Sequence, residues 1–419
     1  MSPVTVAARP MLCPAKGLAR TVCQFTPNWF TVTMGTGVLA LVLNQFPIPI
    51  QDLHQGLQQA SQWLAPDILE WLDGAVGQIH QGLHEAGRVL WLLNIGLFTL
   101  FSLLYAARWV FFFSGAQRVF QHSVASMFFG AIPMGLATII NGFLTFGVPL
   151  WGDVAVSIAQ PLWWVDVALS VASGLLVPFL MFTRQDHSME KMTAVWLIPI
   201  VAAEVAAASG GILIPHLPDA EAFNVLIISY ALWAFSVPLA MSILVILLMR
   251  LILHKLPDRD MAASGWLSLG PIGTGALGLI LLGGDAPRTF ASAGIPIAGD
   301  VAFGIGIIGG TVFWGYGVWW LMLAVLKMVR YVRLGMPFNL GWWGFTFPLG
   351  VYTLATLALA RVTHLELFSI AGGLLAICLA GFWVLVAART IHGAWFGYLF
   401  VAPCLPQGAI PDRFEADIV

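Results

Sequence analysis

The side chains that could take part in chemistry are few in this sequence, and they lie inside long apolar stretches. Glu204 is the clearest case, because it falls near the middle of a stretch long enough to cross a membrane, where an ionisable group is a functional hypothesis by default. Glu204 could stay neutral and bond to a neighbouring helix. Alternatively, it could be a proton site that couples the movement of an anion to a proton gradient.

Small polar groups recur in the other apolar stretches. Threonine hydroxyls and the backbone amides exposed at glycines are weak donors, which suits an anion that must bind and then leave again. A threonine within a helix also often bonds its own backbone, which would leave it without a transport role. Under the first interpretation, the residues expected to line a substrate path are Gly35, Thr36, Gly37, Pro133, Thr138, Glu204, Pro271, Thr274, Thr346 and Pro348.

Phe347 stands directly before Pro348 in the string FTFPLG. An aromatic ring at a proline-marked position of an inner helix could close a narrow path as a hydrophobic constriction. The other interpretation is that Phe347 is packed or faces lipid, as most phenylalanines in membrane helices do. The residue types alone leave both interpretations open.

The composition restricts the kind of protein that could carry these groups. Of 419 residues, 59% are hydrophobic and 9% are charged, whereas about a quarter of the residues in a soluble domain are charged. A soluble enzyme, a nucleic-acid-binding protein and a disulfide-rich secreted domain are therefore excluded. The four cysteines have no Cys-x-x-Cys spacing, so we expect neither a metal site nor a disulfide.

Ten apolar stretches are long enough to be transmembrane helices. They cover residues 28–46, 88–107, 123–146, 162–182, 193–214, 223–249, 262–283, 301–326, 340–360 and 367–388. If both termini are cytoplasmic, all Lys and Arg residues except Arg88, Arg288 and Arg361 lie on the cytoplasmic side, as the positive-inside rule requires. This basic excess could also raise the anion concentration at the cytoplasmic mouth.

The odd-numbered stretches repeat a pattern of an early proline followed by small residues. The four prolines are Pro133, Pro199, Pro271 and Pro348, and they are separated by about the length of one helical hairpin. The first stretch has the small residues but begins at Pro27. A proline bends a helix and frees a backbone carbonyl that must find a partner or water. The pattern predicts an all-α polytopic membrane protein of ten transmembrane helices, arranged as five hairpins around a central pore.

Three segments flank or interrupt this array. Residues 1–26 form a cytoplasmic N-terminal segment, 27–400 the transmembrane domain and 401–419 a cytoplasmic tail. Within the transmembrane domain, residues 47–87 are too polar to span a membrane. Their apolar spacing predicts an amphipathic helix that lies on the external face.

Several strings resemble the tellurite-resistance/dicarboxylate transporter family, which includes sulfite efflux pumps, malate permeases and slow-type anion channels. The resemblance runs from NWFTVTMGTG at Asn28 to FNLGWWGFTFPLG, which ends at Gly350. FFGAIPMGLATIIN, WWVD and LGPIGTGALGLILL are most similar to the sulfite-pump branch. TMGTG, FTR and WLIPIVA are also similar to the dicarboxylate branch.

The resemblance implies five hairpins around a central pore, commonly in a trimer, with a phenylalanine of the ninth span blocking the pore. Phe347 matches this phenylalanine through its TFP context, so the resemblance implies that Phe347 is the pore gate. We therefore expect a homotrimer in the lipid bilayer of the plasma membrane that transports a small anion, with sulfite efflux as the first hypothesis. The alternatives are a proton-linked malate or C4-dicarboxylate carrier and a chloride or nitrate channel. No cofactor, metal, nucleic acid or catalytic residue is expected.

Overall fold

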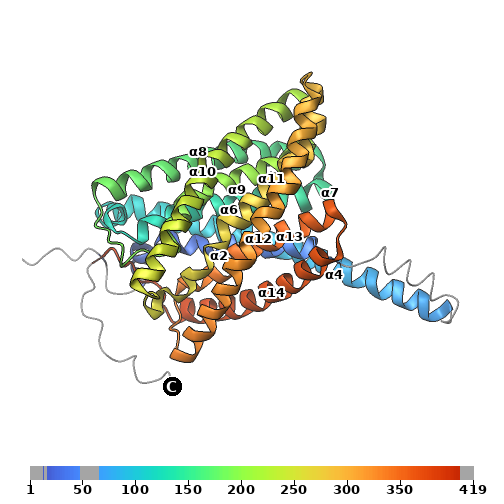
Figure 1. Ribbon diagram of the computed structural model, residues 1–419. Coiled ribbons are helices and arrows are strands. Elements are labelled where there is room, and N and C mark those ends of the chain that lie inside the picture. The colour runs from blue at the N-terminus through green and yellow to red at the C-terminus, as the bar shows by residue number, and fades with distance from the viewer. Residues whose placement is uncertain (1–12, 14–16, 48–65, 406–419) are drawn as a thin grey trace, which may run out of the picture.

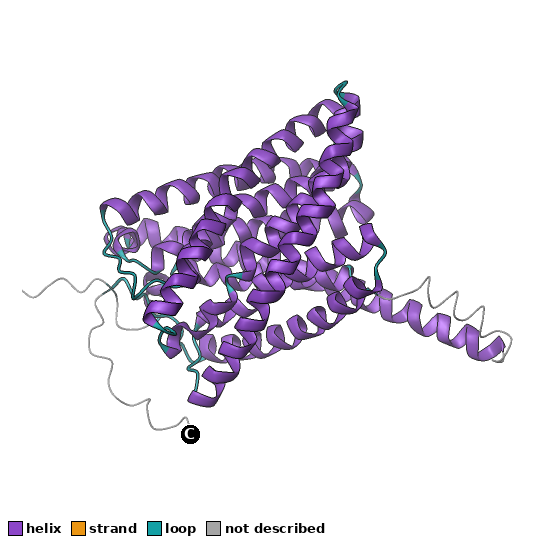
Figure 2. Ribbon diagram, in the orientation of Figure 1, coloured by secondary structure: helices purple, strands orange, loops and turns teal. Residues whose placement is uncertain are grey.

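The fold is a bundle of helices in the computed structural model, which describes residues 13, 17–47 and 66–405 (Figure 1). These residues contain no β-strand (Figure 2). The five inner helices are α2 (Phe30–Asn44), α6 (Ala131–Gly142), α9 (Ile198–Leu213), α11 (Leu269–Ser292) and α13 (Phe347–Thr363). The five outer helices are α4 (Pro66–Phe111), α8 (Asp153–Thr183), α10 (Asp219–His254), α12 (Pro296–Leu334) and α14 (Glu366–Trp395).

Burial separates the two sets of helices. In the most apolar part of the spans that contain α6, α9, α11 and α13, 78–94% of the residues are buried, against 17–39% in the five outer helices. Helix α2 is buried along nearly its whole length. The contacts run α2 to α6 to α9 to α11 to α13, and α13 packs back on α2, so the inner helices close a ring. The predicted five-hairpin architecture is thus confirmed.

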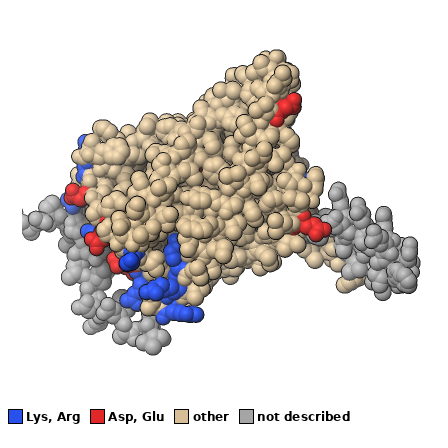
Figure 3. Space-filling model, viewed as in Figure 1, with Lys and Arg blue, Asp and Glu red and all other residues tan. Residues whose placement is uncertain are grey.

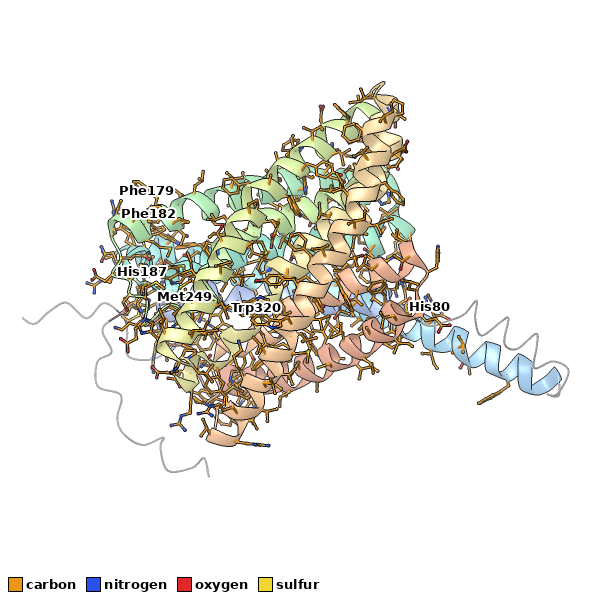
Figure 4. The ribbon with its side chains drawn as sticks, viewed as in Figure 1. His80, Phe179, Phe182, His187, Met249 and Trp320 are labelled. Carbon is orange, nitrogen blue, oxygen red and sulfur yellow. A yellow bond between two sulfur atoms is a disulfide. The ribbon has the colours of Figure 1, made fainter. Side chains whose placement is uncertain are left out.

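The outer helices present apolar side chains to their surroundings, as lipid-facing helices do. Phe179 and Phe182 project from the end of α8 and are 61% and 81% exposed (Figure 4). Nine helices of the described residues are long and apolar enough to cross a membrane. The remaining predicted span is α2, which has only 15 residues and follows directly on a 3-10 turn.

Each inner helix begins with a 3-10 turn. These turns are η1 (Pro27–Trp29), η3 (Ala125–Gly130), η5 (Ala194–Leu197), η7 (Arg259–Trp266) and η8 (Leu340–Phe345). Pro133, Pro199, Pro271 and Pro348 all lie in the first turn of the α-helix that follows. At that position a missing N–H costs little, because it would have no partner within the helix. The expectation that these prolines bend the helices is therefore wrong: they mark where a 3-10 turn becomes an α-helix.

Glycine allows the inner helices to approach closely. A Cβ atom on Gly273 of α11 would lie 2.7 Å from the backbone nitrogen of Tyr352 of α13. A Cβ atom on Gly130 would lie 2.3 Å from the carbonyl oxygen of Ile198, at the junction of η3 and α9. Small residues therefore set the spacing of the ring, as they do in other membrane bundles.

Helix α4 extends beyond the bundle. It is one continuous helix, and its first turns project away from the other helices (Figure 1). It meets α2 at His84, whose Nδ1 is 2.7 Å from Asn44 Oδ1, and at Gly87, which packs on the Ala40 carbonyl. The predicted amphipathic helix on the external face is wrong for residues 66–87, because they continue α4 outward. Residues 48–65 of that prediction lie outside the described residues.

The remaining short elements connect these helices or flank them. They are the α-helices α1 (Leu18–Gln24), α5 (Phe113–Ala116) and α7 (Val148–Trp151), the 3-10 turns η2 (Gln117–Gln121) and η6 (Ile214–His216), and the π-helical turn η4 (Phe143–Gly147).

The two terminal segments pack on each other at one end of the bundle. The Ala402 N–H donates to Gln24 Oε1 at 2.6 Å, and the Trp29 and Phe400 rings stack at 4.8 Å. Cys13 and Cys23 are joined by a disulfide. The expectation of no disulfide is therefore wrong: residue spacing alone does not show that the two Cα atoms lie 5.9 Å apart.

Candidate functional site

A cavity of about 510 Å³ opens at the end of the inner ring where the five 3-10 turns gather. All five repeats contribute to its wall, and the segment after α14 adds Tyr398 and Leu399 at its edge. One lining residue from each repeat, in chain order, is Asn28, Phe128, Val195, Ser264 and Asn339. The cavity therefore lies on the axis that the fivefold arrangement creates. We call it the vestibule.

Apolar side chains line the part of the vestibule nearest the α-helices. They are Met34 of α2, Ile198 of α9 and Phe347 of α13, with Pro348 beside Phe347. Phe347 is 4% exposed. Within the described part of the chain, no aromatic ring stacks closely on Phe347, whereas its neighbour Phe345 stacks on Phe382 at 5.3 Å. The Phe347 ring thus borders the vestibule without an aromatic partner that would hold it.

Uncharged donors line the outer part of the vestibule. Thr31 Oγ1 donates to the Asn28 carbonyl at 2.6 Å, and Asn339 Oδ1 accepts from the Gly341 N–H at 2.8 Å. Asn339 also donates through Nδ2 to the Asp260 carbonyl at 2.9 Å, which joins η8 to η7. Amide and hydroxyl groups of this kind can solvate an anion without trapping it.

The electrostatic field of the vestibule comes mainly from the backbone. Five inner helices point their N-terminal ends at it, and each such end carries a partial positive charge. The vestibule wall has no Lys or Arg among the described residues, and it has one acidic side chain, that of the exposed Asp260. Lys and Arg gather at this same end of the molecule, away from the projecting part of α4 (Figure 3).

A histidine lies at the edge of the vestibule. His122 Nδ1 accepts hydrogen bonds from the backbone N–H groups of Val124 and Ala125, at 3.2 and 3.1 Å. Both of these residues line the vestibule. Burial lowers the pKa of the His122 imidazole below its ordinary value. The neutral ring is therefore the form that caps the start of η3.

The predicted path residues fall into two groups. Phe347 and Pro348 line the vestibule. Thr346 lies directly behind them, donates to the Trp343 carbonyl at 2.8 Å and packs on Gly35. The structure therefore brings four predicted residues together where α2 meets α13, namely Gly35, Thr346, Phe347 and Pro348.

The second group packs against outer helices. Asn94 of α4 donates to Thr138 Oγ1 at 3.0 Å, and Gly37 fits against both side chains. Trp383 of α14 donates to Thr36 Oγ1 at 3.1 Å. The structure does not bring these residues to the vestibule, nor does it bring Pro133, Pro271 or Thr274 there.

The two buried carboxyl groups also lie outside the vestibule. Glu204 is fully buried, and its carboxyl oxygens have no hydrogen-bond partner among the described residues. Ser236 of α10 lies nearby and donates to the Ile200 carbonyl at 2.8 Å, so Glu204 lies between an inner and an outer helix. Asp166 of α8 is fully buried as well. This face of α8 packs against α9, where the Trp163 indole donates to the Ala206 carbonyl at 2.9 Å.

Sequence reasoning missed the residues of the 3-10 turns, Asn28, Ser264 and Asn339 among them. A signal was present, because Thr193 and Asn339 each accept a bond from the N–H two residues later, as residues that begin a helix do. That signal identifies where a helix begins. Only the ring arrangement shows that five such beginnings meet.

Comparison with known proteins agrees with this architecture. The family described as voltage-dependent anion channel matches residues 24–391. The chain is 38% identical to the sulfite efflux pump of Trichophyton rubrum over 382 residues, which are 90% of this chain and 93% of the pump. It is 27% identical to an uncharacterised transporter of Methanocaldococcus jannaschii, over 90% of this chain and 95% of that protein.

A more distant relative carries a different name. The malic acid transport protein of Schizosaccharomyces pombe is 22% identical over 385 residues, which are 89% of this chain and 79% of that protein. The resemblance noted in the inner-helix strings is thus confirmed over nearly the whole chain. The chain is a multi-pass membrane protein that belongs to the voltage-dependent anion channel family.

Proposed function

We propose that this protein exports a small oxyanion, with sulfite as the first candidate, from the cytoplasm through the centre of its inner ring. The observation that carries the proposal is the vestibule, where five helix N-termini and uncharged donors meet above Phe347. The name of the Trichophyton rubrum relative supports sulfite as the anion.

The orientation follows from the distribution of charge. Lys and Arg gather at the vestibule end of the molecule (Figure 3), and basic residues favour the cytoplasmic side. The vestibule would then be the cytoplasmic entrance, with both terminal segments on the same side of the plasma membrane. The exposed apolar faces of the outer helices fit a lipid bilayer and the packing of three copies in a homotrimer.

Phe347 would act as the gate. The ring is buried next to the vestibule and has no stacked aromatic partner among the described residues, so it can move at low cost. The barrier would be steric and caused by the exclusion of water, since the ring offers no group that binds an anion. The residues next to it, Gly35, Thr346 and Pro348, would set its position.

A malate carrier is the second candidate, because the malic acid transport protein of Schizosaccharomyces pombe is a relative over most of this chain. A channel for chloride or nitrate is the third, from the description of the family. All of these anions need hydroxyl and amide donors, and the vestibule wall has hydroxyl and amide groups.

Flux into proteoliposomes separates these candidates. Purified protein would be tested with sulfite, sulfate, malate, chloride and nitrate, each with and without a pH gradient. We expect sulfite to move fastest and empty liposomes to show no flux. Faster malate flux that depends on the pH gradient would support the second candidate, and flux of none of the anions would overturn the proposal.

A further inference from the structure

Lys327 is a cation that an outer helix turns toward the inner ring. It lies on α12, where its Nζ is 3.5 Å from the Gly265 carbonyl oxygen of η7. The same ammonium group is 5.7 Å from the centre of the Trp320 ring, which lies on α12 (Figure 4). Arg330 and Arg333 follow on the same helix but are exposed. Of these three cations, Lys327 alone contacts η7, in which Ser264, the residue before Gly265, lines the vestibule.

A small cavity of about 20 Å³ lies behind that wall. It is lined by Lys327, Arg250, Tyr331 and Gly265, among others, and also by Ser264. Ser264 lines the vestibule as well. A single turn of η7 therefore separates Lys327 from the space that an anion would occupy.

The positive charge at this place is not neutralised by a carboxylate. Arg250 is 3% exposed, and its three guanidinium nitrogens donate to the backbone carbonyls of Glu190 and Lys255. Lys327 donates to a carbonyl too. In the described ranges, no acidic side chain comes within ion-pair distance of either residue. Carbonyl oxygens satisfy the donors of both side chains without adding a negative charge.

Such a charge acts differently from one on the surface. Mobile ions screen exposed charges beyond about 10 Å at 0.1 M salt, whereas a partly buried charge is screened much less. Its field also acts through protein of low dielectric constant, where charges interact more strongly than in water. The exposed Arg330 and Arg333 should affect anions only at low salt, but Lys327 should affect them at any salt concentration.

We propose that Lys327 is a specificity-determining residue for anion transport: its ammonium charge, acting through the η7 turn, holds anions in the vestibule and favours doubly charged over singly charged ones. This inference rests on the proposed function. The preference follows from Coulomb's law, because the interaction energy is proportional to the charge of the anion. Any factor by which Lys327 favours a singly charged anion is therefore squared for a doubly charged one.

The test compares Lys327→Met with Lys327→Arg in proteoliposomes at pH 7.5, with nitrate as the singly charged anion and sulfite as the largely doubly charged one. Methionine keeps an unbranched apolar stem and removes the charge, while arginine keeps the charge. We expect Lys327→Met to lower nitrate flux about threefold and sulfite flux about ninefold, at low and high salt alike. Lys327→Arg should stay near the wild type.

Arg330→Met is the matched control, because it removes an exposed charge from the same helix. It should lower flux at low salt only. Equal loss of nitrate and sulfite flux in Lys327→Met would overturn the proposal and show that Lys327 only supports η7. A loss of flux in Lys327→Arg as large as that in Lys327→Met would overturn it too. So would a loss of flux in Lys327→Met that high salt abolishes.

A second variant covers the case in which Lys327→Met does not fold. In Gly265→Ala, the new Cβ would lie 3.0 Å from Nζ, so the ammonium group must shift while its charge remains. We expect a smaller loss than in Lys327→Met, and again a larger one for sulfite than for nitrate. Equal losses for the two anions would count against the proposal. If the wild type itself carries neither anion, the proposed function fails instead, so the two failures are distinguishable.

Discussion

The inner and outer helices have similarly apolar sequences but are buried to very different extents. Mean hydropathy overlaps between the two sets, at 1.4–2.0 for the four inner spans α6, α9, α11 and α13 and 1.6–2.4 for the outer ones. The inner helices nevertheless bury most of their residues and the outer helices expose most of theirs. Hydropathy therefore shows that a helix lies in a membrane, whereas small residues and an early proline show that it belongs to the inner ring.

The largest expected effect comes from filling the space between inner helices. Gly273→Ala places a methyl group against the backbone of Tyr352, which cannot move like a flexible side chain. Overpacking of this kind typically costs about 1–3 kcal/mol, so the yield of folded protein and its thermal stability should fall sharply. Size-exclusion chromatography and thermal unfolding in detergent measure both.

The matched control is Gly315→Ala on the outer helix α12, where a Cβ atom would meet nothing within 4 Å. This variant should behave as the wild type. If the two variants were equally stable, the inner ring would not be packed as tightly as the backbone distances indicate.

The second prediction concerns Phe347 and the rate of anion flux. If Phe347 is the gate, Phe347→Ala should raise anion flux per folded protein by about tenfold or more, because removing a hydrophobic constriction lowers a barrier without adding a binding group. Phe345→Ala is the control: that ring stacks on Phe382, and its loss should cost about 3–5 kcal/mol of stability with no gain in flux. Lower flux and lower stability together in Phe347→Ala would show that its ring is a packing residue.

A third prediction tests the boundary between the inner and outer helices, where Glu204 lies next to Ser236. If Glu204 couples protons to transport, Glu204→Gln should keep downhill anion flux and lose its dependence on an imposed pH gradient. Flux measurements with and without that gradient check this, with Asp166→Asn as a control at the other fully buried carboxyl group. An unchanged pH dependence in Glu204→Gln would leave the residue with a structural role only.

The smallest effect should come from His122, in the loop that leads from an outer to an inner helix. Because its pKa is lowered by burial, the neutral ring is favoured in the folded protein. Its contribution to stability is complete above the pKa of the unfolded chain, about 6.5, and is lost as the pH falls through the lower folded value. His122→Ala should cost about 1 kcal/mol at pH 8 and progressively less toward pH 5, as measured by thermal unfolding. A cost that does not change with pH would mean that the ring only fills space.

Much of the architecture could be predicted from the sequence, and for a physical reason. Membrane-spanning length, the bias of Lys and Arg and the repeated early prolines are local properties, so they can be read without coordinates. The choice of Phe347 came from the family resemblance, through its TFP context, and the structure places its ring at the vestibule. Its action as a gate stays a prediction.

The site residues were harder to predict because they depend on the direction in which a side chain points. Thr36 and Thr138 lie on inner helices, yet they bond to Trp383 and Asn94 of outer helices. Lys327 lies on an outer helix, yet it reaches an inner turn. Asn28 and Asn339 are far apart in the chain and meet only because the ring closes. The spacing of residues along a single helix does not show which neighbouring element each of these side chains reaches.

The parallel course of the five inner helices has an electrical consequence. Each inner helix has an antiparallel outer neighbour, but only the inner helices end at the vestibule, where all five of their N-termini face the cavity and their partial positive charges add. An anion driven from the vestibule side starts from a site that already concentrates it, and one driven from the opposite side does not. Under equal salt on both sides of a membrane, the current–voltage relation should therefore be curved, so that the protein acts as a rectifier.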